Sequence, residues 1–152
     1  MHELSEDEWH STIDGNLTAT FLTMKTFRPG MIGRRGGSIV TMASSAGRTP
    51  TPATPAPYAA AKAGIVMLTR HVASQVGQYG VRVNCLSPST VLTERTSRQM
   101  PDDTKQRFTA LHPLGRLGEP KDVAEAACFL ASDSASWLTG VVLDVAGGAV
   151  MV

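Results

Sequence analysis

The alternation of strand-like and helical segments is the feature that most constrains the fold. Short apolar, β-branched runs predict buried strands at Ser38–Met42, Val81–Leu86 and Val141–Val145. Segments with helical periodicity lie before and between them. Strands that alternate with helices favour a parallel sheet that is covered on both faces. We therefore expect one α/β domain over residues 1–152, with the three strands adjacent and parallel.

The helical segments carry recognisable start signals. Ser5 and Glu8 form an S-x-x-E capping box, and a helix is expected to run from there to just before Pro29 and Gly30. Its predicted apolar face consists of Trp9, Ile13, Leu17, Phe21 and Met24. A second long helix is expected over residues 58–79 and a short one over 102–111. A further helix begins at Pro120, with an apolar face made by Val123, Ala126, Ala127 and Leu130. The proline-rich segment 47–57 is expected to be a loop.

Composition excludes several functions. With 42% hydrophobic residues, 18% charged residues and a net charge of +1, the chain is globular and lacks the basic patch of a nucleic-acid binder. It has neither a secretory signal nor an apolar run of about 20 residues, so we expect a cytoplasmic protein without membrane contact. Cys85 and Cys128 are predicted to be small buried hydrophobes. The four histidines show no ligand spacing, so no metal site is predicted.

The sharpest chemical signal is the pair formed by Tyr58 and Lys62. Residues i and i+4 share one helix face, and an ammonium close to a phenol favours the phenolate. Such a tyrosine can exchange a proton with a substrate near neutral pH. Taken alone, the spacing is also common on solvated helix faces.

Ser45 strengthens this interpretation because it follows a predicted buried strand by a few residues. In open α/β sheets, ligands bind outside the carboxyl ends of the strands, where Ser45 and the start of the Tyr58 helix would converge. Two alternatives exist for this segment. In the first, Ser44 and Ser45 only cap the loop, and in the second, one of them is a hydrolase nucleophile. The second alternative lacks the first glycine of the G-x-S-x-G motif.

Several ordered motifs resemble those of short-chain dehydrogenase/reductases. They are the Ser38–Gly47 segment, Tyr58-x-x-x-Lys62, Asp14-Gly15-Asn16-Leu17, Val83–Pro88, His112–Pro120, Phe129–Asp133, Thr139-Gly140 and Gly147-Gly148. The resemblance runs from about Leu4 to Gly148. It implies a partial Rossmann-like, doubly wound parallel sheet, made of the last three strands with their flanking helices. It also implies hydride transfer between NAD or NADP and a small carbonyl or alcohol substrate.

The resemblance assigns a role to each matching residue. Tyr58 would donate the proton in reduction and accept it in oxidation, and it would also contact the cofactor. Lys62 would tune Tyr58 and hold the nicotinamide ribose. Ser45 would bond the substrate oxygen, and Asn16 would place a water molecule behind Lys62. The residues that would line the nicotinamide are Pro88, Val91 and Thr93.

Two positions depart from the family pattern. Ser89 stands where the family usually has glycine, and it would be strained if that position required a positive φ. Ala146 stands where the family usually has aspartate before the closing glycine pair. Both departures put the geometry of the cofactor loop in question.

The family's opening strand and glycine-rich pyrophosphate turn have no counterpart in this sequence. Residues 33–37 are glycine-rich but precede a strand instead of following one. We therefore expect a catalytic portion without the first strands, with an apolar edge at Ser38–Met42 and weak NAD(P)H binding.

The alternative to an enzyme is an inactive, truncated fragment that keeps only an association surface. In the family, the helix that corresponds to Tyr58–Tyr79 commonly pairs with its copy, which implies a homo-oligomer. The face expected to make this contact consists of Ala63, Gly64, Met67, His71 and Val72.

Overall fold

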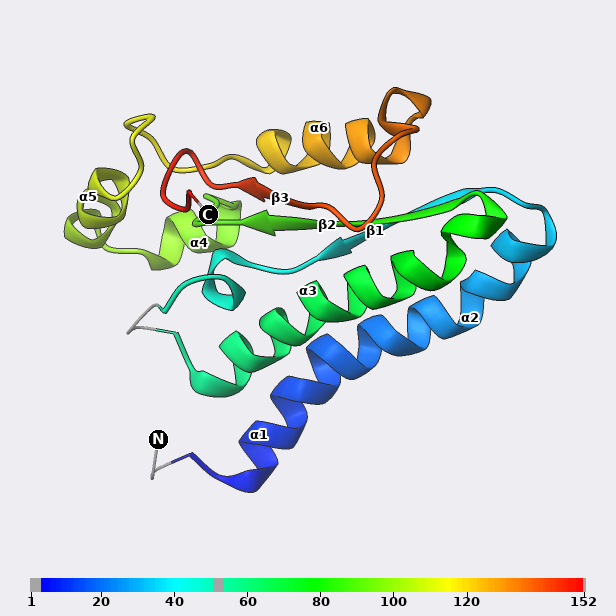
Figure 1. Cartoon of the computed structure of the whole chain (residues 1–152). Helices are drawn as coiled ribbons and strands as arrows, with labels where there is room; N and C mark the ends of the chain where they lie inside the picture. The colour runs from blue at the N-terminus through cyan, green and yellow to red at the C-terminus, as the bar shows by residue number, and fades with distance from the viewer. Residues whose placement is uncertain (1–3, 51–53, 152) are drawn as a thin grey trace.

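The computed structural model describes residues 4–50 and 54–151, and it places helices on both faces of a parallel sheet (Figure 1). The strands are β1 (Gly37–Met42), β2 (Val81–Pro88) and β3 (Val142–Val145), in the order β1-β2-β3. Both pairings are parallel, which confirms the predicted α/β class and the adjacency of the strands. Strand β1 forms one edge of this sheet, as predicted.

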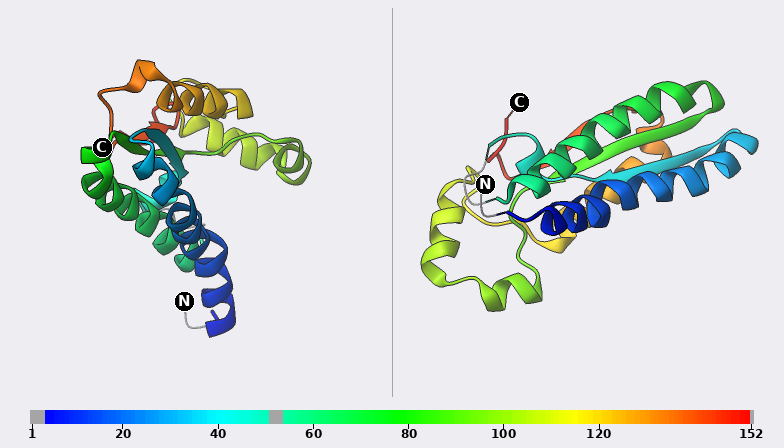
Figure 2. Two further views of the ribbon diagram at one scale, coloured as in Figure 1. Left: turned by 90° about the vertical axis from the view of Figure 1, so that its right-hand side faces the viewer. Right: turned by 90° about the horizontal axis from the view of Figure 1, so that it is seen from below.

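The N-terminal helical segment begins at the predicted capping box. The Glu8 amide donates to Ser5 Oγ at 3.2 Å, and the Ser5 amide donates to Glu8 Oε2 at 2.9 Å. The segment consists of α1 (Glu6–Ile13), a π-helical turn (Asp14–Thr18) and α2 (Ala19–Gly33). Figure 2 shows these elements end to end, with α2 beside the following long helix.

The predicted end of this helix is wrong, because α2 continues through Pro29 to Gly33. Proline lacks an N–H group and removes one helical hydrogen bond, but the next turns remain helical, with the Arg34 amide donating to the Gly30 carbonyl. Met31 and Ile32 in these turns pack against the core. Their tertiary packing offsets the cost of the proline.

The predicted apolar face of this segment is only partly correct. Met24 is buried, whereas Trp9 and Phe21 are 39% and 47% exposed. The π-helical turn adds a residue to one turn, and one residue corresponds to a rotation of about 100°. Side chains on the two sides of this turn therefore do not share the face that uninterrupted α-helical spacing predicts.

Helix α3 (Ala56–Val76) packs along the sheet on the same side as α2 (Figure 1). It continues as a 3-10 turn to Tyr79, close to the predicted end. It begins before Tyr58, because Pro57 fits the first helical turn, where its missing N–H group costs little. Its buried residues Val72 and Val76 form a core cluster with Val81 of β2. Of the predicted loop, residues 51–53 lie outside the described part of the chain.

Helix α6 (Pro120–Ala131) covers the opposite face of the sheet (Figure 1). Its predicted apolar face is confirmed, since Leu130 is fully buried and the other three residues pack around the same cluster. Cys85 is buried in β2 as predicted, but Cys128 is exposed. That prediction failed because Cys128 lies outside the apolar stripe of the helix. Two shorter helices, α4 (Glu94–Gln99) and α5 (Asp102–Ala110), lie beyond the carboxyl ends of β2 and β3 (Figure 1).

None of the helices in the described ranges combines the length and the apolar character that a membrane span requires. Across the same ranges, no three His, Cys, Asp or Glu side chains come together in a way that would hold a metal ion.

Candidate active site

The carboxyl edge of the sheet brings three segments together. After β1 the chain passes through Ala43 and Ser44 into a 3-10 turn (Ser45–Gly47) that packs on the start of α3. Tyr58 is the third residue of α3, and Ser89 directly follows β2. Parallel strands end at one edge of a sheet, so these segments converge where open α/β sheets bind their ligands.

Tyr58 and Lys62 are in contact, as their i,i+4 spacing predicts. The Lys62 ammonium lies 5.3 Å from the centroid of the Tyr58 ring, within cation–π range. Lys62 Nζ also donates to the Met42 carbonyl at 3.1 Å, which ties α3 to the end of β1. Partial burial lowers the pKa of Lys62, because desolvation disfavours its charged form.

Replacing Lys62 by methionine is expected to change how stability depends on alkaline pH. Because the Lys62 pKa is lowered in the folded chain, the unfolded chain binds more protons between that lowered value and 10.5, the value of an unperturbed lysine. The free energy of unfolding of the wild type should therefore rise with pH across this window, relative to Lys62→Met. Urea unfolding at a series of pH values measures the difference. Lys25→Met, at an exposed position on α2, is the control, and parallel profiles for wild type and Lys62→Met would contradict the expectation.

Tyr58 opens into a cavity of about 530 Å³, here named the tyrosine cavity. Its wall is built from three segments of the chain: Ser44, Ser45, Ala46, Thr49, Pro50, Thr54 and Tyr58; Ser89 and Thr90; and Phe108, Leu111, His112, Ala149 and Val150. Hydroxyl and apolar groups dominate this wall, and among the residues that the structure describes it contains no Asp, Glu, Lys or Arg side chain. Both the proline-rich segment 47–57 and the segment 89–111, which follows β2, contribute residues to it.

Two serines reach the tyrosine cavity, although the sequence favoured one of them. Ser45 lines it as expected, and so does Ser44. Ser44 Oγ accepts from the Ala46 amide at 3.2 Å, so the capping interpretation holds for Ser44. A hydroxyl that accepts in this way keeps its own proton for a ligand. The adjacent Ser-Ser pair was the available sequence signal for this second hydroxyl.

Asn16 and Lys62 line a neighbouring cavity of about 320 Å³, between α2 and β1. Asn16 lies within the π-helical turn, and its side-chain amide donates to the Thr12 carbonyl at 2.9 Å. Irregular turns of this kind frequently occur at functional sites. The four predicted catalytic residues are thus distributed over two cavities, and the Tyr58–Lys62 contact connects them.

The three residues expected beside the nicotinamide follow one another along the chain after β2. Pro88 ends the strand opposite Val145, and Val91 forms an isolated parallel bridge with Gly118. Thr93 caps α4, where its hydroxyl accepts from the Thr96 amide at 3.1 Å. Val91 and Thr93 therefore stabilise the local structure, and their contact with a cofactor stays a prediction.

The backbone strain considered for Ser89 is absent. Among the described residues other than glycine, only Arg35 has a positive φ, so Ser89 adopts an ordinary backbone conformation. Its amide donates to the Val145 carbonyl at 3.2 Å. Ala146 is 5% exposed, so the second departure places a small side chain in a closely packed position.

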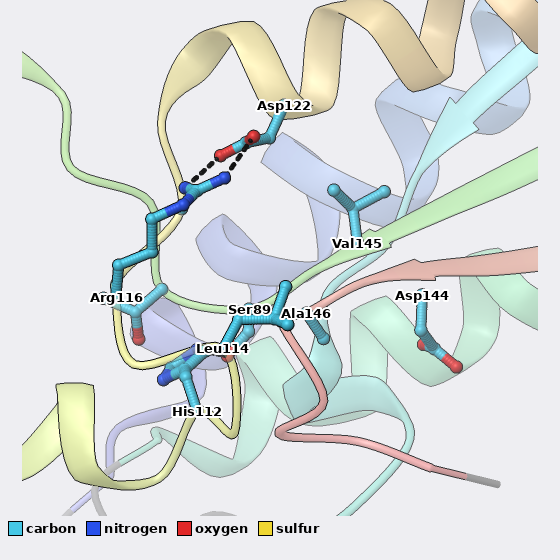
Figure 3. Close-up of a pocket in the computed structure, with 11 residues that line it drawn as sticks. Ser89, His112, Leu114, Arg116, Asp122, Asp144, Val145 and Ala146 are labelled. Carbon is cyan, nitrogen blue, oxygen red and sulfur yellow. Dashed lines mark hydrogen bonds and ion pairs between the residues drawn. The ribbon is translucent and has the colours of Figure 1, made fainter.

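Ser89 and Ala146 also line a smaller cavity of about 180 Å³ at the end of β3, here named the β3 cavity (Figure 3). Arg116 and Asp122 in its wall form two hydrogen bonds of 2.7 Å each. This contact holds the pKa of Asp122 well below its usual range. Asp144, on the other side of the cavity, pairs with Arg48 at 3.0 Å and so links β3 to the serine segment. The charges around this cavity are therefore mutually compensated.

The outer face of α3 differs from the predicted association face. Val72 is 6% exposed and belongs to the core, and a Cβ on Gly64 would lie 2.8 Å from Leu17. Val72 and Gly64 therefore make contacts within this chain and are not available to a second copy. Ala63, Met67 and His71 do lie exposed on the helix, with Met67 61% exposed.

Fold and site together define a class of protein. A parallel sheet covered on both faces by helices is typical of α/β proteins that bind ligands at the carboxyl edge. In this chain the helix after the edge strand carries the Tyr58-x-x-x-Lys62 pair. A family model described as "Enoyl-(Acyl carrier protein) reductase" matches residues 1–150. The chain belongs to the short-chain dehydrogenase/reductase family.

Individual relatives agree with this assignment. The chain is 42% identical to 3-oxoacyl-[acyl-carrier-protein] reductase FabG of Chlamydia pneumoniae over 97% of its own length and 59% of the relative. The crystal structure of a 3-oxoacyl-[acyl-carrier protein] reductase from Brucella melitensis matches with a TM-score of 0.96 and 38% identity, over 100% of this chain and 56% of that one. A second structure, of a 3-oxoacyl-[acyl-carrier protein] reductase from Brucella melitensis with bound NAD, matches with a TM-score of 0.92 and 39% identity, over 100% of this chain and 55% of that one. This chain thus spans less than two thirds of each.

Proposed function

We propose that this chain carries the proton-transfer part of an NAD(P)-dependent oxidoreductase that interconverts a carbonyl compound and its alcohol. The observation that supports this most directly is the placement of Tyr58. Its side chain borders an uncharged cavity next to two serine hydroxyls, and its ring is in contact with the half-buried Lys62 ammonium. The identity to 3-oxoacyl-[acyl-carrier-protein] reductases favours a 3-oxoacyl thioester or another ketone as the substrate.

Each of these residues would have a separate role in reduction. Ser45 donates a hydrogen bond to the carbonyl oxygen, with Ser44 as the second candidate in the same cavity. Tyr58 gives its phenolic proton to that oxygen as the carbon accepts a hydride, so the product is an alcohol and a phenolate. The Lys62 ammonium stabilises the phenolate. Asn16, in the cavity behind Lys62, holds the water that returns the proton. In oxidation the same steps run backward.

The donors at Lys62 suit a nicotinamide ribose. An ammonium has three N–H donors, and the Met42 carbonyl uses one of them. The others can bond the two ribose hydroxyls, while Pro88, Val91 and Thr93 lie along the segment next to the nicotinamide ring. The cofactor supplies the hydride, and the protein orients and polarises the substrate. NAD and NADP are both candidate cofactors.

Reduced nicotinamide mononucleotide tests this proposal, because it carries the nicotinamide and ribose groups that these residues would hold, with a single phosphate and without the adenosine half of the dinucleotide. We expect saturable binding, followed by its fluorescence, and at least tenfold weaker binding to Lys62→Ala. Lys105→Ala, on α5, should bind like the wild type. Equal affinity of wild type and Lys62→Ala would contradict the proposal, and so would an absence of binding to wild type.

A second candidate function rests on the exposed face of α3. Ala63, Met67 and His71 would form a contact with another copy of the chain, in line with the expected homo-oligomer. A chain that associates through this face but does not bind the mononucleotide would be the inactive fragment considered above. Sedimentation of wild type and Met67→Glu shows whether the face is used. We place either form in the cytoplasm.

A further inference from the structure

Ser89 and His112 form a hydrogen-bonded pair in the wall shared by the tyrosine cavity and the β3 cavity (Figure 3). The distance from His112 Nε2 to Ser89 Oγ is 3.0 Å, and His112 is only 5% exposed. The two residues are 23 positions apart in the sequence. Ser89 occupies the position at which the resemblance leads one to expect a glycine, so the resemblance does not account for this pair.

The surroundings of His112 fix the direction of the hydrogen bond. His112 Nδ1 lies 2.7 Å from the Phe108 carbonyl oxygen, which can only accept. Nδ1 must therefore carry the proton, and in the neutral ring Nε2 is then an acceptor. Ser89 must donate its single hydroxyl proton to Nε2. Its oxygen keeps only lone pairs for the adjoining cavities.

Packing holds the imidazole in this orientation. A Cβ on Gly147 would lie 3.4 Å from His112 Cδ2, so the turn after β3 closes on one side of the ring. The Ser89 backbone is fixed as well, because its amide bonds to the Val145 carbonyl. His112 is thus a positioning residue, because it determines that the Ser89 hydroxyl acts as a hydrogen-bond acceptor toward a ligand.

We propose that Ser89 Oγ is a specificity-determining acceptor that selects an uncharged hydrogen-bond donor on the molecule bound beside Tyr58. This inference rests on the proposed function and extends it to the chemistry of the ligand. Two groups have that chemistry, namely a second hydroxyl on the substrate and the carboxamide N–H₂ of the cofactor. A cationic donor is disfavoured because no Asp or Glu is among the described residues in the wall of the tyrosine cavity, and the acidic side chains in the β3 cavity, Asp122 and Asp144, are paired with arginines.

The direction of the hydrogen bond is testable without any ligand. Long-range nitrogen NMR of the histidine rings at neutral pH should show His112 with the proton on Nδ1. Ser89→Ala should shift the Nε2 resonance, whereas Ser89→Thr should leave it near the wild-type position. A ring protonated on Nε2 in the wild type would overturn the proposal.

Two matched pairs of probes then identify the donor. Hydroxyacetone and methoxyacetone differ in one hydroxyl donor, and reduced nicotinamide mononucleotide and its 3-acetylpyridine analogue differ in the carboxamide donor. In NMR titrations, Ser89→Ala should weaken the donor-bearing member of one pair by about fivefold and leave its donor-free partner unchanged. Ser89→Thr should retain wild-type affinity. The pair that responds shows whether the substrate or the cofactor supplies the donor.

His112→Phe adds a test of the positioning role. It removes the acceptor of the Ser89 proton, so Ser89 can donate as well as accept, and discrimination within the responding pair should fall. Equal weakening of both members by Ser89→Ala, or no weakening of either, overturns the proposal for Ser89. If Lys62→Ala still weakens the mononucleotide, the proposed function survives that result. Failure of every probe to bind wild type overturns both.

Discussion

Replacing Tyr58 by phenylalanine is expected to lower the rate of ketone reduction by about 10²–10⁴-fold, the usual contribution of a positioned proton donor. The change removes one hydroxyl and keeps the ring, so the cation–π contact with Lys62 and the packing of α3 remain. The affinity of Tyr58→Phe for NADH and NADPH should therefore change little, while its turnover number falls by this factor. Steady-state assays with NADH and NADPH measure this in a chimera that places the N-terminal part of the chlamydial relative before this chain.

The chain offers a matched control, because Tyr79 is its only other tyrosine. Tyr79 lies in the 3-10 turn at the far end of α3, so Tyr79→Phe should retain full activity. Alanine at Ser44 and at Ser45, in the same assay, identifies the hydroxyl that contacts the substrate. A Tyr58→Phe chimera with more than about a tenth of wild-type turnover would show that another group supplies the proton.

Local sequence signals predicted the elements because their causes are local. The capping box at Ser5, the apolar face of α6 and the three β-branched strands depend on spacing within one segment, and all are present. The errors arose where packing or a local irregularity prevailed over spacing. Helix α2 continues through Pro29 because Met31 packs against the core. The π-helical turn shifts the side chains after it, including Phe21, away from the face that regular α-helical spacing predicts.

The same distinction applies to the site. The Tyr58–Lys62 contact follows from a spacing of four residues, which any helix brings onto one face. The Arg48–Asp144 ion pair joins residues 96 positions apart, and only the assembled sheet edge brings them together. Ser89 stood out as a departure in the sequence, but its partner could not be identified without the fold.

Gly47 shows how closely the serine segment is fitted to α3. A Cβ at this position would lie 2.6 Å from the Ala63 nitrogen and 2.6 Å from the Lys62 carbonyl carbon. Both are backbone atoms of a helix and cannot rotate away, as the end of a flexible side chain could. Any side chain at position 47 must therefore push the 3-10 turn and the helix apart.

Gly47→Ala is accordingly expected to lower the free energy of unfolding by about 1–3 kcal/mol, the typical cost of overpacking. The effect on catalysis should be larger. The displaced turn carries Ser45 at its start, and a shift of about 1 Å in a catalytic group can cost on the order of 10²-fold in rate. Urea unfolding of the chain and turnover of the chimera measure the two effects. Gly33→Ala, where an added Cβ has no neighbour within 4 Å, is the control for loss of a glycine. If Gly47→Ala lost stability but kept its turnover, the position of the serine segment against α3 would not matter for catalysis, and the roles assigned to Ser44 and Ser45 would have to be withdrawn.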